Sequence, residues 1–450
     1  MKKILPSLIL LCSLVGSAQD FWTEVSYFPE QVFAPKQISI VDANVVWIYG
    51  YNGWSPGTTA QQWLRTTDGG TTWTQGNFTL GNTDLQVSAL HAVSETVAYA
   101  SANTTIPSIS GGIWMTSDAG ATWTRQPNCF NGAESFANFV HLWNATDGIA
   151  IGDPNQGYLE IYRTQNAGEN WVRVPSANIA VPLDGETGYT SLYEIRYNSI
   201  WFGTNKGRIF KSDDLGENWH VIQSPLPDFD SSTSKGRFAF KNQNEGLLID
   251  GNWNQHKSTD AGNTWNIENT PTGNARNGNI AFIPETPNAY FSWGEELLMG
   301  ILGASYTTDN GLSWIDLNET DLRPLNVTTA EFKSNTVGFC FGYYHFTGPN
   351  GLFFFRLGED TFRRFLSTND QLLTTKLSVV PNPATDFVRI EGKNIKSVNV
   401  FDISGKKVLS ENYSISDAVT LKLSQLQKGI YIAKVSDGSN TTETVKIIKN

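Results

Sequence analysis

The chain has 450 residues, of which 40% are hydrophobic, and its 15 Trp supply enough apolar surface to argue against a wholly disordered protein. Residues 20–376 carry 20 Lys and Arg against 36 Asp and Glu, a net charge of −16, whereas residues 377–450 carry 10 against 7. The acidic main part argues against nucleic acid and anionic membranes as partners, because both require a basic face.

Residues 1–18 have the three parts of an export signal. Met1-Lys2-Lys3 precedes a mostly apolar run from Ile4 to Val15, and Gly16-Ser17-Ala18 supplies small residues for cleavage. We therefore expect a signal peptide over residues 1–18, cleaved after Ala18. No later stretch is apolar and long enough to predict a transmembrane segment in the mature chain.

Two cysteines remain after removal of the signal, Cys129 and Cys340. In an exported protein they can form one disulfide, or they can be two buried thiols that pack as small hydrophobic groups. Neither has a His or Cys partner at metal-ligand spacing, so we predict no metal site.

One octapeptide recurs six times between residues 66 and 314, at intervals of 46 to 50 residues. Each copy has Ser or Thr first, Asp or Asn third, Gly fifth and Trp eighth. The third side chain can accept hydrogen bonds from the following amides, Gly tolerates positive φ, and Trp can be buried between neighbours. The pattern therefore predicts a structural strand–turn–strand unit. Its defining residues are Asp68 and Trp73, Asp118 and Trp123, Asn166 and Trp171, Asp214 and Trp219, Asp260 and Trp265, and Asp309 and Trp314.

Four short strands surround each copy, for example residues 88–92, 97–100, 113–116 and 123–125. Four antiparallel strands repeated at this period are typical of a propeller blade. Residues 326–366 repeat the strand pattern with a degraded turn, and residues 21–25 look like a fourth strand that closes the ring. We predict an all-β fold with a seven-bladed β-propeller over residues 19–366; eight blades are the alternative.

The octapeptide resembles the Asp box of BNR and sialidase-like repeat propellers, and the whole unit resembles photosystem II assembly factor-like propellers. The resemblance implies the fold, but that group spans enzymes and pure binders. A sialidase would clamp a carboxylate with three Arg, for which Arg237, Arg276 and Arg323 are candidates. A sialidase-type Tyr–Glu pair and the N-terminal Arg motif are not found.

Residues 377–450 follow a polar linker over residues 367–376 and alternate apolar residues with Gly turns, which predicts a small β-sandwich. The run Pro381-Asn382-Pro383-Ala384-Thr385-Asp386 and the later Gly429-Ile430-Tyr431 resemble the type A sorting domain of the type IX secretion system of Bacteroidetes. The resemblance implies a protein that is secreted or held at the outer cell surface, with the type IX machinery as partner of residues 377–450.

The two faces of a propeller carry different loops. In a four-stranded blade the octapeptide turn lies on one face, here called the turn face. The turn between the second and third strands and the link to the next blade lie on the other, the link face. Aromatic, carboxamide and charged side chains in these loops suit a sugar or peptide ligand. The candidate ligand residues of this rim are Trp54, Asp153, Asn155, Arg237, Asp250, Trp253, Arg276, Trp293, Glu295, Arg323 and Tyr343.

The sequence therefore predicts an exported, non-catalytic propeller that binds a glycan or protein partner at the cell surface through the link-face rim. The alternative is a glycoside hydrolase that uses Asp153 with Asp250 or Glu295, since such enzymes need two carboxylates across the site. A scaffold for a surface complex is a third reading. Motifs for metal, phosphate or nucleophile chemistry are not found, so we assign no catalytic residue and no cofactor.

Overall fold

The computed structural model describes residues 21–29, 33–51, 59–106, 108–132, 134–267, 271–296, 301–317, 325–344, 351–358, 361–362, 378–402, 406–437 and 442–450. It divides into two compact units, residues 1–366 and 367–450. The expected signal peptide and the linker lie outside the described residues.

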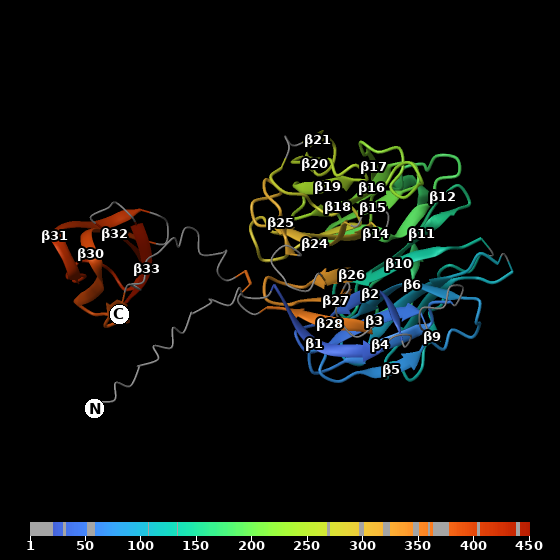
Figure 1. Cartoon of the computed structure of the whole chain (residues 1–450), viewed down its shortest axis with the longest axis horizontal. Coiled ribbons are helices and arrows are strands. Elements are labelled where there is room, and N and C mark those ends of the chain that lie inside the picture. Colours follow the sequence, from blue (N-terminus) through green and yellow to red (C-terminus); the bar gives the residue numbers. More distant parts are fainter. Residues whose placement is uncertain are drawn as a thin grey trace, which may run out of the picture. The chain divides into compact units, whose positions relative to one another are not determined.

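The first unit is a seven-bladed β-propeller, as predicted. Seven four-stranded antiparallel sheets are arranged around a common centre (Figure 1). From the inner to the outer strand, blades 1 to 3 are β2 (Ala34–Ile40), β3 (Val46–Tyr51), β4 (Gln62–Thr66) and β5 (Thr74–Asn77); β6 (Gln86–Ala92), β7 (Ala98–Asn103), β8 (Gly112–Thr116) and β9 (Thr124–Arg125); and β10 (Ala137–Leu142), β11 (Gly148–Asn155), β12 (Tyr158–Thr164) and β13 (Val172–Arg173). Blades 4 to 6 are β14 (Gly188–Arg196), β15 (Ser199–Thr204), β16 (Arg208–Ser212) and β17 (His220–Gln223); β18 (Gly236–Phe240), β19 (Gly246–Asp250), β20 (Gln255–Ser258) and β21 (Asn266–Ile267); and β22 (Asn279–Phe282), β23 (Tyr290–Glu296), β24 (Ile301–Thr307) and β25 (Ile315–Asp316).

Blade 7 is built from both ends of the unit. Its inner strands are β26 (Leu325–Phe332), β27 (Gly338–Tyr344) and β28 (Gly351–Leu357), and β1 (Trp22–Pro29) pairs antiparallel with β28 as the outermost strand. The register runs from Trp22 opposite Leu357 to Pro29 opposite Gly351. This confirms the predicted ring closure, which Figure 1 shows where the blue and orange ends meet.

Aromatic side chains fill the spaces between the blades. The ring of Trp47 in blade 1 lies 6.4 Å from that of Trp123 in blade 2, and Trp201 in blade 4 stacks on Phe240 in blade 5 at 4.2 Å. The second strands of the blades are covered on both faces; all six residues of β7 and of β15 are buried. Burial of large rings between sheets is the main source of packing energy here.

The six octapeptide turns share one hydrogen-bond pattern. The first hydroxyl donates to Oδ1 of the third residue at 2.7–3.0 Å, and the same Oδ1 accepts the seventh backbone N–H at 2.8–3.0 Å. The fourth N–H donates to a carbonyl in the turn between the first two strands, as from Ala119 to Thr96 and from Leu215 to Asn198. The octapeptide turns and the first-to-second-strand turns therefore lie on the same face.

The turns place two consecutive residues in the left-handed region. The fifth residue, glycine, has φ of 82° to 98°, and the fourth also has positive φ although it is Ala, Leu or Asn in five copies, with φ of 60° at Leu215. The sequence analysis anticipated only the glycine. The eighth residue is buried in four copies, whereas Trp73 and Trp265 are partly exposed.

Both cysteines are free, buried thiols, the second of the two alternatives. Cys129 lies in the link between blades 2 and 3, and Cys340 lies in β27 of blade 7. Burial raises the pKa of Cys129 to about 12 and that of Cys340 well above its usual value. Neither thiol therefore has nucleophilic character at neutral pH.

The second unit is a small, β-sandwich-like domain of five strands. They are β29 (Ser378–Val380), β30 (Phe387–Asp402), β31 (Lys407–Lys422), β32 (Gly429–Asp437) and β33 (Thr442–Lys449). The long β30 pairs with β29, β31 and β32 along different parts of its length, so the sheet encloses an apolar core that includes Ile390, Val398 and Leu421. In the part of the chain that the structure describes, there is no helix with the length and hydropathy to cross a membrane.

Candidate functional site

The structure distributes the predicted rim residues among several local environments. Trp54 and Arg323 lie outside the described residues, and for Glu295 only the backbone, in β23, is described. The remaining residues belong to blades 3, 5, 6 and 7 and to the links beside them. Most of them make contacts within their own blade, so they do not form one described ligand pocket.

Asp153, at the link-face end of β11, joins blades 3 and 4. One oxygen, Oδ1, accepts hydrogen bonds from Asn138 Nδ2 at 2.9 Å and from the Gly188 backbone N–H at 2.8 Å. Burial raises the pKa of Asp153 to about 6, although both hydrogen bonds oppose that shift. The carboxyl is therefore partly protonated near neutral pH and serves as a bridge between two blades.

Asp250 organises the turn between β19 and β20. It accepts hydrogen bonds from the backbone of Asn252 and Asn254, from Asn254 Nδ2, and from His256 Nε2 at 3.3 Å. Burial opposes ionisation of Asp250, but the hydrogen bonds outweigh it and lower the pKa. Trp253 has a φ of 62° in the same turn and is partly buried. The side chain of Asp250 is thus fully used in shaping this turn.

The two described arginines of the suggested clamp have different partners. Arg237 donates to the Phe229 carbonyl at 3.1 Å and lies 3.6 Å from Asp230, in the link between blades 4 and 5. Arg276 is buried and pairs with Asp316 on the outer strand of blade 6. Both guanidinium groups are therefore occupied by protein acids, and a shared carboxylate site is not formed by them.

Trp293, Asn155 and Tyr343 also have structural surroundings. Trp293 is only 6% exposed and packs against Phe291 inside the core between blades 6 and 7, so its ring is not at the rim surface. Asn155 Nδ2 donates to Ser135 Oγ at 3.2 Å. Tyr343 is partly buried in β27, opposite Asn326.

A link-face loop, residues 181–187, contains none of the predicted ligand residues of the rim. Its anchor is Glu186, whose side chain is fully buried. Glu186 pairs with Arg208 at 3.1 Å, accepts the Thr204 hydroxyl at 2.6 Å, and accepts the Leu183 backbone N–H at 2.7 Å. Arg208 also donates to the Val181 carbonyl at 3.2 Å. An ion pair this buried, with its remaining oxygens satisfied, fixes the loop between blades 3 and 4.

The loop presents two aliphatic side chains to solvent. Val181 is 77% exposed and Leu183 is 52% exposed, with the exposed Asp184 beside them. Single exposed apolar residues are common, but here a buried anchor holds two of them close together at a rim. The apolar run Val181-Pro182-Leu183 inside a loop was the sequence signal that could have indicated this feature.

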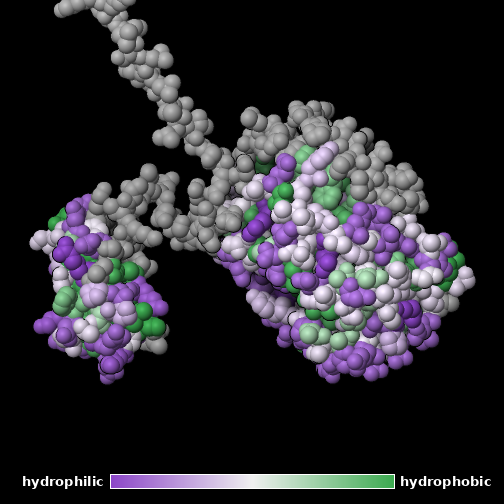
Figure 2. All heavy atoms as spheres, turned by 90° about the horizontal axis from the view of Figure 1, so that it is seen from below, coloured by the Kyte–Doolittle hydropathy of each residue, from purple (hydrophilic) through white to green (hydrophobic). Residues whose placement is uncertain are grey.

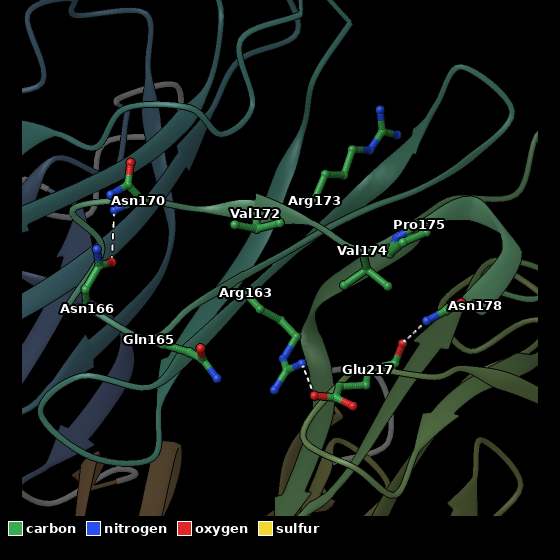
Figure 3. Close-up of a pocket in the computed structure, with 10 residues that line it drawn as sticks. All are labelled: Arg163, Gln165, Asn166, Asn170, Val172, Arg173, Val174, Pro175, Asn178 and Glu217. Carbon is green, nitrogen blue, oxygen red and sulfur yellow. Dashed lines mark hydrogen bonds and ion pairs between the residues drawn. The ribbon is translucent and has the colours of Figure 1, made fainter.

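The turn face has two described cavities. A groove of about 540 Å³ lies between blades 3 and 4 and is shown in Figure 3. Arg163 and Glu217, on facing walls, form an ion pair at 2.6 Å, and Asn178 Nδ2 donates to the Glu217 carbonyl. Val172, 70% exposed, also lines the groove. These contacts join the two blades.

The second cavity, of about 560 Å³, is the turn-face mouth of the central channel, here called the funnel. It is lined by Ile40, Val41, His91, Ala92, Val93, His141, Leu142, Trp143, Asn144, Ala145, Ile195, Tyr197 and Lys333. All of these residues come from inner strands or from the turns that follow them.

Two histidines in the funnel wall are neutral. Their rings lie 4.4 Å apart. Burial lowers the pKa of His91 to about 4, and burial with the neighbouring His91 and Lys333 charges lowers that of His141 well below its usual value. His91 Nε2 donates to the Leu142 carbonyl at 2.9 Å. Among the described residues, no group of three or more His, Cys, Asp and Glu is arranged to hold a metal ion.

The surface of the propeller that Figure 2 shows has hydrophilic and hydrophobic side chains interspersed.

Residues 378–450 match the family described as a secretion system C-terminal sorting domain. The chain is therefore a β-propeller protein that carries a type IX secretion sorting domain, and it is exported to the cell surface or beyond it.

Solved propellers share the fold. YCF48 bound to D1 peptide is 15% identical, with a TM-score of 0.51 over 75% of this chain and 97% of that one. YCF48 from Cyanidioschyzon merolae is 14% identical, with a TM-score of 0.50 over 75% and 98%. The GH74 xyloglucanase from Xanthomonas campestris is 11% identical, with a TM-score of 0.45 over 95% and 67%. No curated protein sequence matches the chain.

Proposed function

We propose that this exported propeller is a non-catalytic binding module that docks a protein partner at the cell surface through its link face. The observation that carries the proposal is the rim loop, in which the buried Glu186–Arg208 pair holds Val181 and Leu183 exposed to solvent. Apolar side chains fixed in one geometry lower the entropy cost of binding and fit a protein surface better than a glycan.

The use of the rim carboxylates supports binding over catalysis. Asp228 accepts the Tyr189 hydroxyl at 2.6 Å, Asp230 lies beside Arg237, and Asp250 accepts four hydrogen bonds in its own turn. A glycosidase needs two carboxyl groups that face substrate, one as acid and one as nucleophile or base. The described rim carboxylates are mostly engaged by the protein itself. A propeller of this fold, YCF48, has been solved with a peptide bound, which agrees with a binding role.

The test is an array of peptides, folded proteins and glycans probed with the full exported chain and with a Val181→Ser, Leu183→Ser double variant. We expect protein or peptide ligands whose affinity falls about tenfold in the double variant, because two apolar contacts are lost. The matched control is Ile267→Ser, which removes a side chain 67% exposed on blade 5 and should leave binding unchanged. Ligands that are exclusively glycans, or binding that ignores the double variant, would refute the proposal.

The second candidate, a glycoside hydrolase, has one observation in its favour. Asp153 has a pKa raised to about 6, which suits a general acid, and among the described residues no partner is found for its Oδ2. Incubating each glycan from the array with the wild-type chain and with Asp153→Asn decides between the two. Cleavage that disappears in the variant would establish hydrolase activity that depends on Asp153. Intact glycans in both samples would rule out the hydrolase.

A further inference from the structure

The second unit has a sheet whose outer face is apolar at its centre. Strands β31, β30, β32 and β33 follow one another across this sheet (Figure 1). Ile430 and Ile432 of β32 are 45% and 39% exposed, although the residues that alternate with them are buried. Ile432 lies opposite Phe401 of β30, and Ile430 lies opposite Ile448 of β33. Because cross-strand partners share a face, these four side chains form one apolar patch, here called the outer patch.

Three lysines surround the outer patch. Lys407 of β31 lies opposite Phe401, and Lys446 of β33 lies opposite Ile432. Lys434 is two positions after Ile432 on β32, so it is on the same face. All three lysines are exposed, and none of them forms an ion pair within the described part of the chain.

The carboxylates beside the patch whose side chains are described belong to the other face of the sheet. Glu411 of β31 lies opposite the buried Val398, and Asp402 of β30 lies opposite the buried Tyr431. The outer face therefore combines an apolar centre with a positively charged rim. The charge of the unit agrees with this, because residues 377–450 carry 10 Lys and Arg against 7 Asp and Glu.

The first half of β30 presents a different kind of surface. Arg389 and Glu391 form an exposed ion pair there at 3.0 Å. Phe387, which is 56% exposed, lies opposite Lys422 of β31. A single exposed ring and a paired charge are ordinary features of a solvated sheet, so the outer patch is not a general property of this unit.

We propose that the outer patch is the surface through which the export machinery recognises this unit, and that its partner is an acidic protein surface with an apolar centre. The family match gives the whole unit a role in secretion but assigns no surface to that role. Three lysines without a described ion pair favour a partner rich in Asp and Glu, because complementary charge gives specificity and speeds association. The small size of the patch suits a partner that is held only during export.

Two other occupants fit the outer patch less well. A second copy of the chain would pair the patch with itself, and this symmetric contact would place the lysines of the two copies close together. An anionic lipid surface is typically bound by clusters of about four to eight basic residues, and the patch has three.

The test measures delivery of full-length variants to the cell surface and medium in cells that export the protein. One variant is Ile430→Ser with Ile432→Ser, and the other is Lys434→Glu with Lys446→Glu. We expect each double variant to lower delivery about tenfold or more, because apolar contact or charge complementarity is lost. The lysine pair decides the test, since its side chains are exposed and their replacement removes no buried contact. Equal resistance of residues 378–450 to limited proteolysis in this variant and in wild type verifies that the unit is folded.

The first half of β30 supplies the matched controls. Phe387→Ser matches the isoleucine pair, and Arg389→Glu with Lys422→Glu matches the lysine pair. Both controls should be delivered as wild type. Normal delivery of the Lys434→Glu, Lys446→Glu variant, or an equal loss of delivery in its control, would overturn the proposal.

Cross-linking in living cells tests the chemistry of the partner. Ile432→p-benzoylphenylalanine should cross-link to a protein through a segment rich in Asp and Glu, and adding Lys434→Glu with Lys446→Glu should abolish that product. Cross-linking to a second copy of the chain, or to no protein, would contradict the proposal. The Val181→Ser, Leu183→Ser variant should be delivered normally, so failure of the rim proposal and failure of this one are distinguishable.

Discussion

The third residue of the octapeptide turn is Asn in blade 3 and Asp in the other five copies. This difference allows the energy of one hydrogen bond in the turn to be tested. Asp214 in blade 4 accepts Asn218 Nδ2 at 2.8 Å through Oδ2. Blade 3 has Asn166 instead, whose Oδ1 accepts the Thr164 hydroxyl and the Asn170 backbone N–H and whose amide has no second oxygen. Asn170 occupies the place of Asn218. Blade 3 therefore lacks one charge-assisted hydrogen bond that a single substitution can restore.

We predict that Asn166→Asp stabilises the propeller by about 0.5–1 kcal/mol at pH 7, a value discounted for exposure. In the folded turn the pKa of Asp68, the equivalent residue in blade 1, is lowered to about 2, chiefly by hydrogen bonds from Thr72. A lowered folded pKa gives stability that is present above the unfolded pKa and lost as pH falls through the folded value. The gain should vanish at acid pH, once the new Asp is protonated in the folded turn. All 15 Trp lie in the propeller unit, so Trp fluorescence during urea unfolding reports it. Equal stability of both proteins at pH 7 would contradict the prediction.

The fifth residue of each turn needs glycine for two separable reasons. Gly216 has a φ of 82°, and a Cβ there would lie 2.2 Å from Ile149 Cδ1 of the preceding blade. Gly157 has a similar φ of 87° with open space around it. Gly157→Ala should therefore cost about 1 kcal/mol for backbone strain alone, and Gly216→Ala should cost about 2–4 kcal/mol because overpacking is added. Urea unfolding gives both values; similar losses would mean that the contact with Ile149 is relieved without cost.

At the element scale, blade 7 depends on a strand from the far end of the propeller sequence. Without β1, the long and apolar β28 would become a free sheet edge. We predict that a chain starting at Ala34 shows faster amide exchange in β28 than a chain starting at Gln19, while β7 in blade 2 is unchanged. A synthetic peptide of residues 21–33 should restore protection by adding back the strand. Unaltered exchange in β28 would show that β1 is dispensable.

The elements that sequence predicts best are those dictated by local chemistry. Alternating apolar residues, the left-handed glycine and the Asx-type acceptor fixed the strands, the six turns and the closing strand. The link after β13 is held by contacts with the following blade: Ile179 pairs in parallel with Trp219, and Glu186 is buried with Arg208. Those contacts join residues about 20 to 40 positions apart, so the local sequence does not reveal how the rim loop is held.

The predicted rim residues show the same limit. The types and loop positions of these residues could be predicted from the sequence, but their hydrogen-bond and packing partners could not. Asp250 is used by its own turn, and Trp293 faces the core because it lies on a strand between two blades. The funnel was also missed, since its wall is assembled from inner strands of blades 1, 2, 3, 4 and 7, and no single segment carries its pattern.

At the scale of the whole molecule, titratable groups buried around the central channel make the free energy of unfolding depend on pH. Burial raises the pKa of Glu331 in β26 to about 8, with Lys333, the Ile40 backbone and Arg196 opposing the shift and Glu194 adding to it. Because the folded pKa exceeds the unfolded one, the native state holds the extra proton, and this contribution to stability is lost as pH rises toward 8. His91 and His141, with lowered pKa values, act oppositely below pH 6.5.

We therefore predict that Glu331→Gln stabilises the propeller relative to wild type by on the order of 2 kcal/mol at pH 8.5 and by much less at pH 5. Comparison at the same pH cancels the histidine contribution, which both proteins share. Urea unfolding followed by Trp fluorescence measures the difference at each pH. A difference that does not change between pH 5 and pH 8.5 would mean that Glu331 is ionised in the folded channel.

We expect export to depend on the second unit being folded, and the two units can be tested separately. Val398 is fully buried in the core of that unit, whereas Ile415 on β31 is 63% exposed. An unpaired charge in the core costs several kcal/mol, enough to unfold a domain of this size. We predict that Val398→Asp and deletion of residues 378–450 each abolish delivery to the cell surface and medium, and that Ile415→Asp is delivered normally. Immunoblots of cell, surface and medium fractions measure delivery.

Normal Trp fluorescence of the retained Val398→Asp protein would show that the propeller itself is folded, so that the loss lies in recognition of the sorting domain. Delivery of Val398→Asp at the wild-type level would instead mean that the secretion machinery reads a linear segment of this unit and not its folded surface.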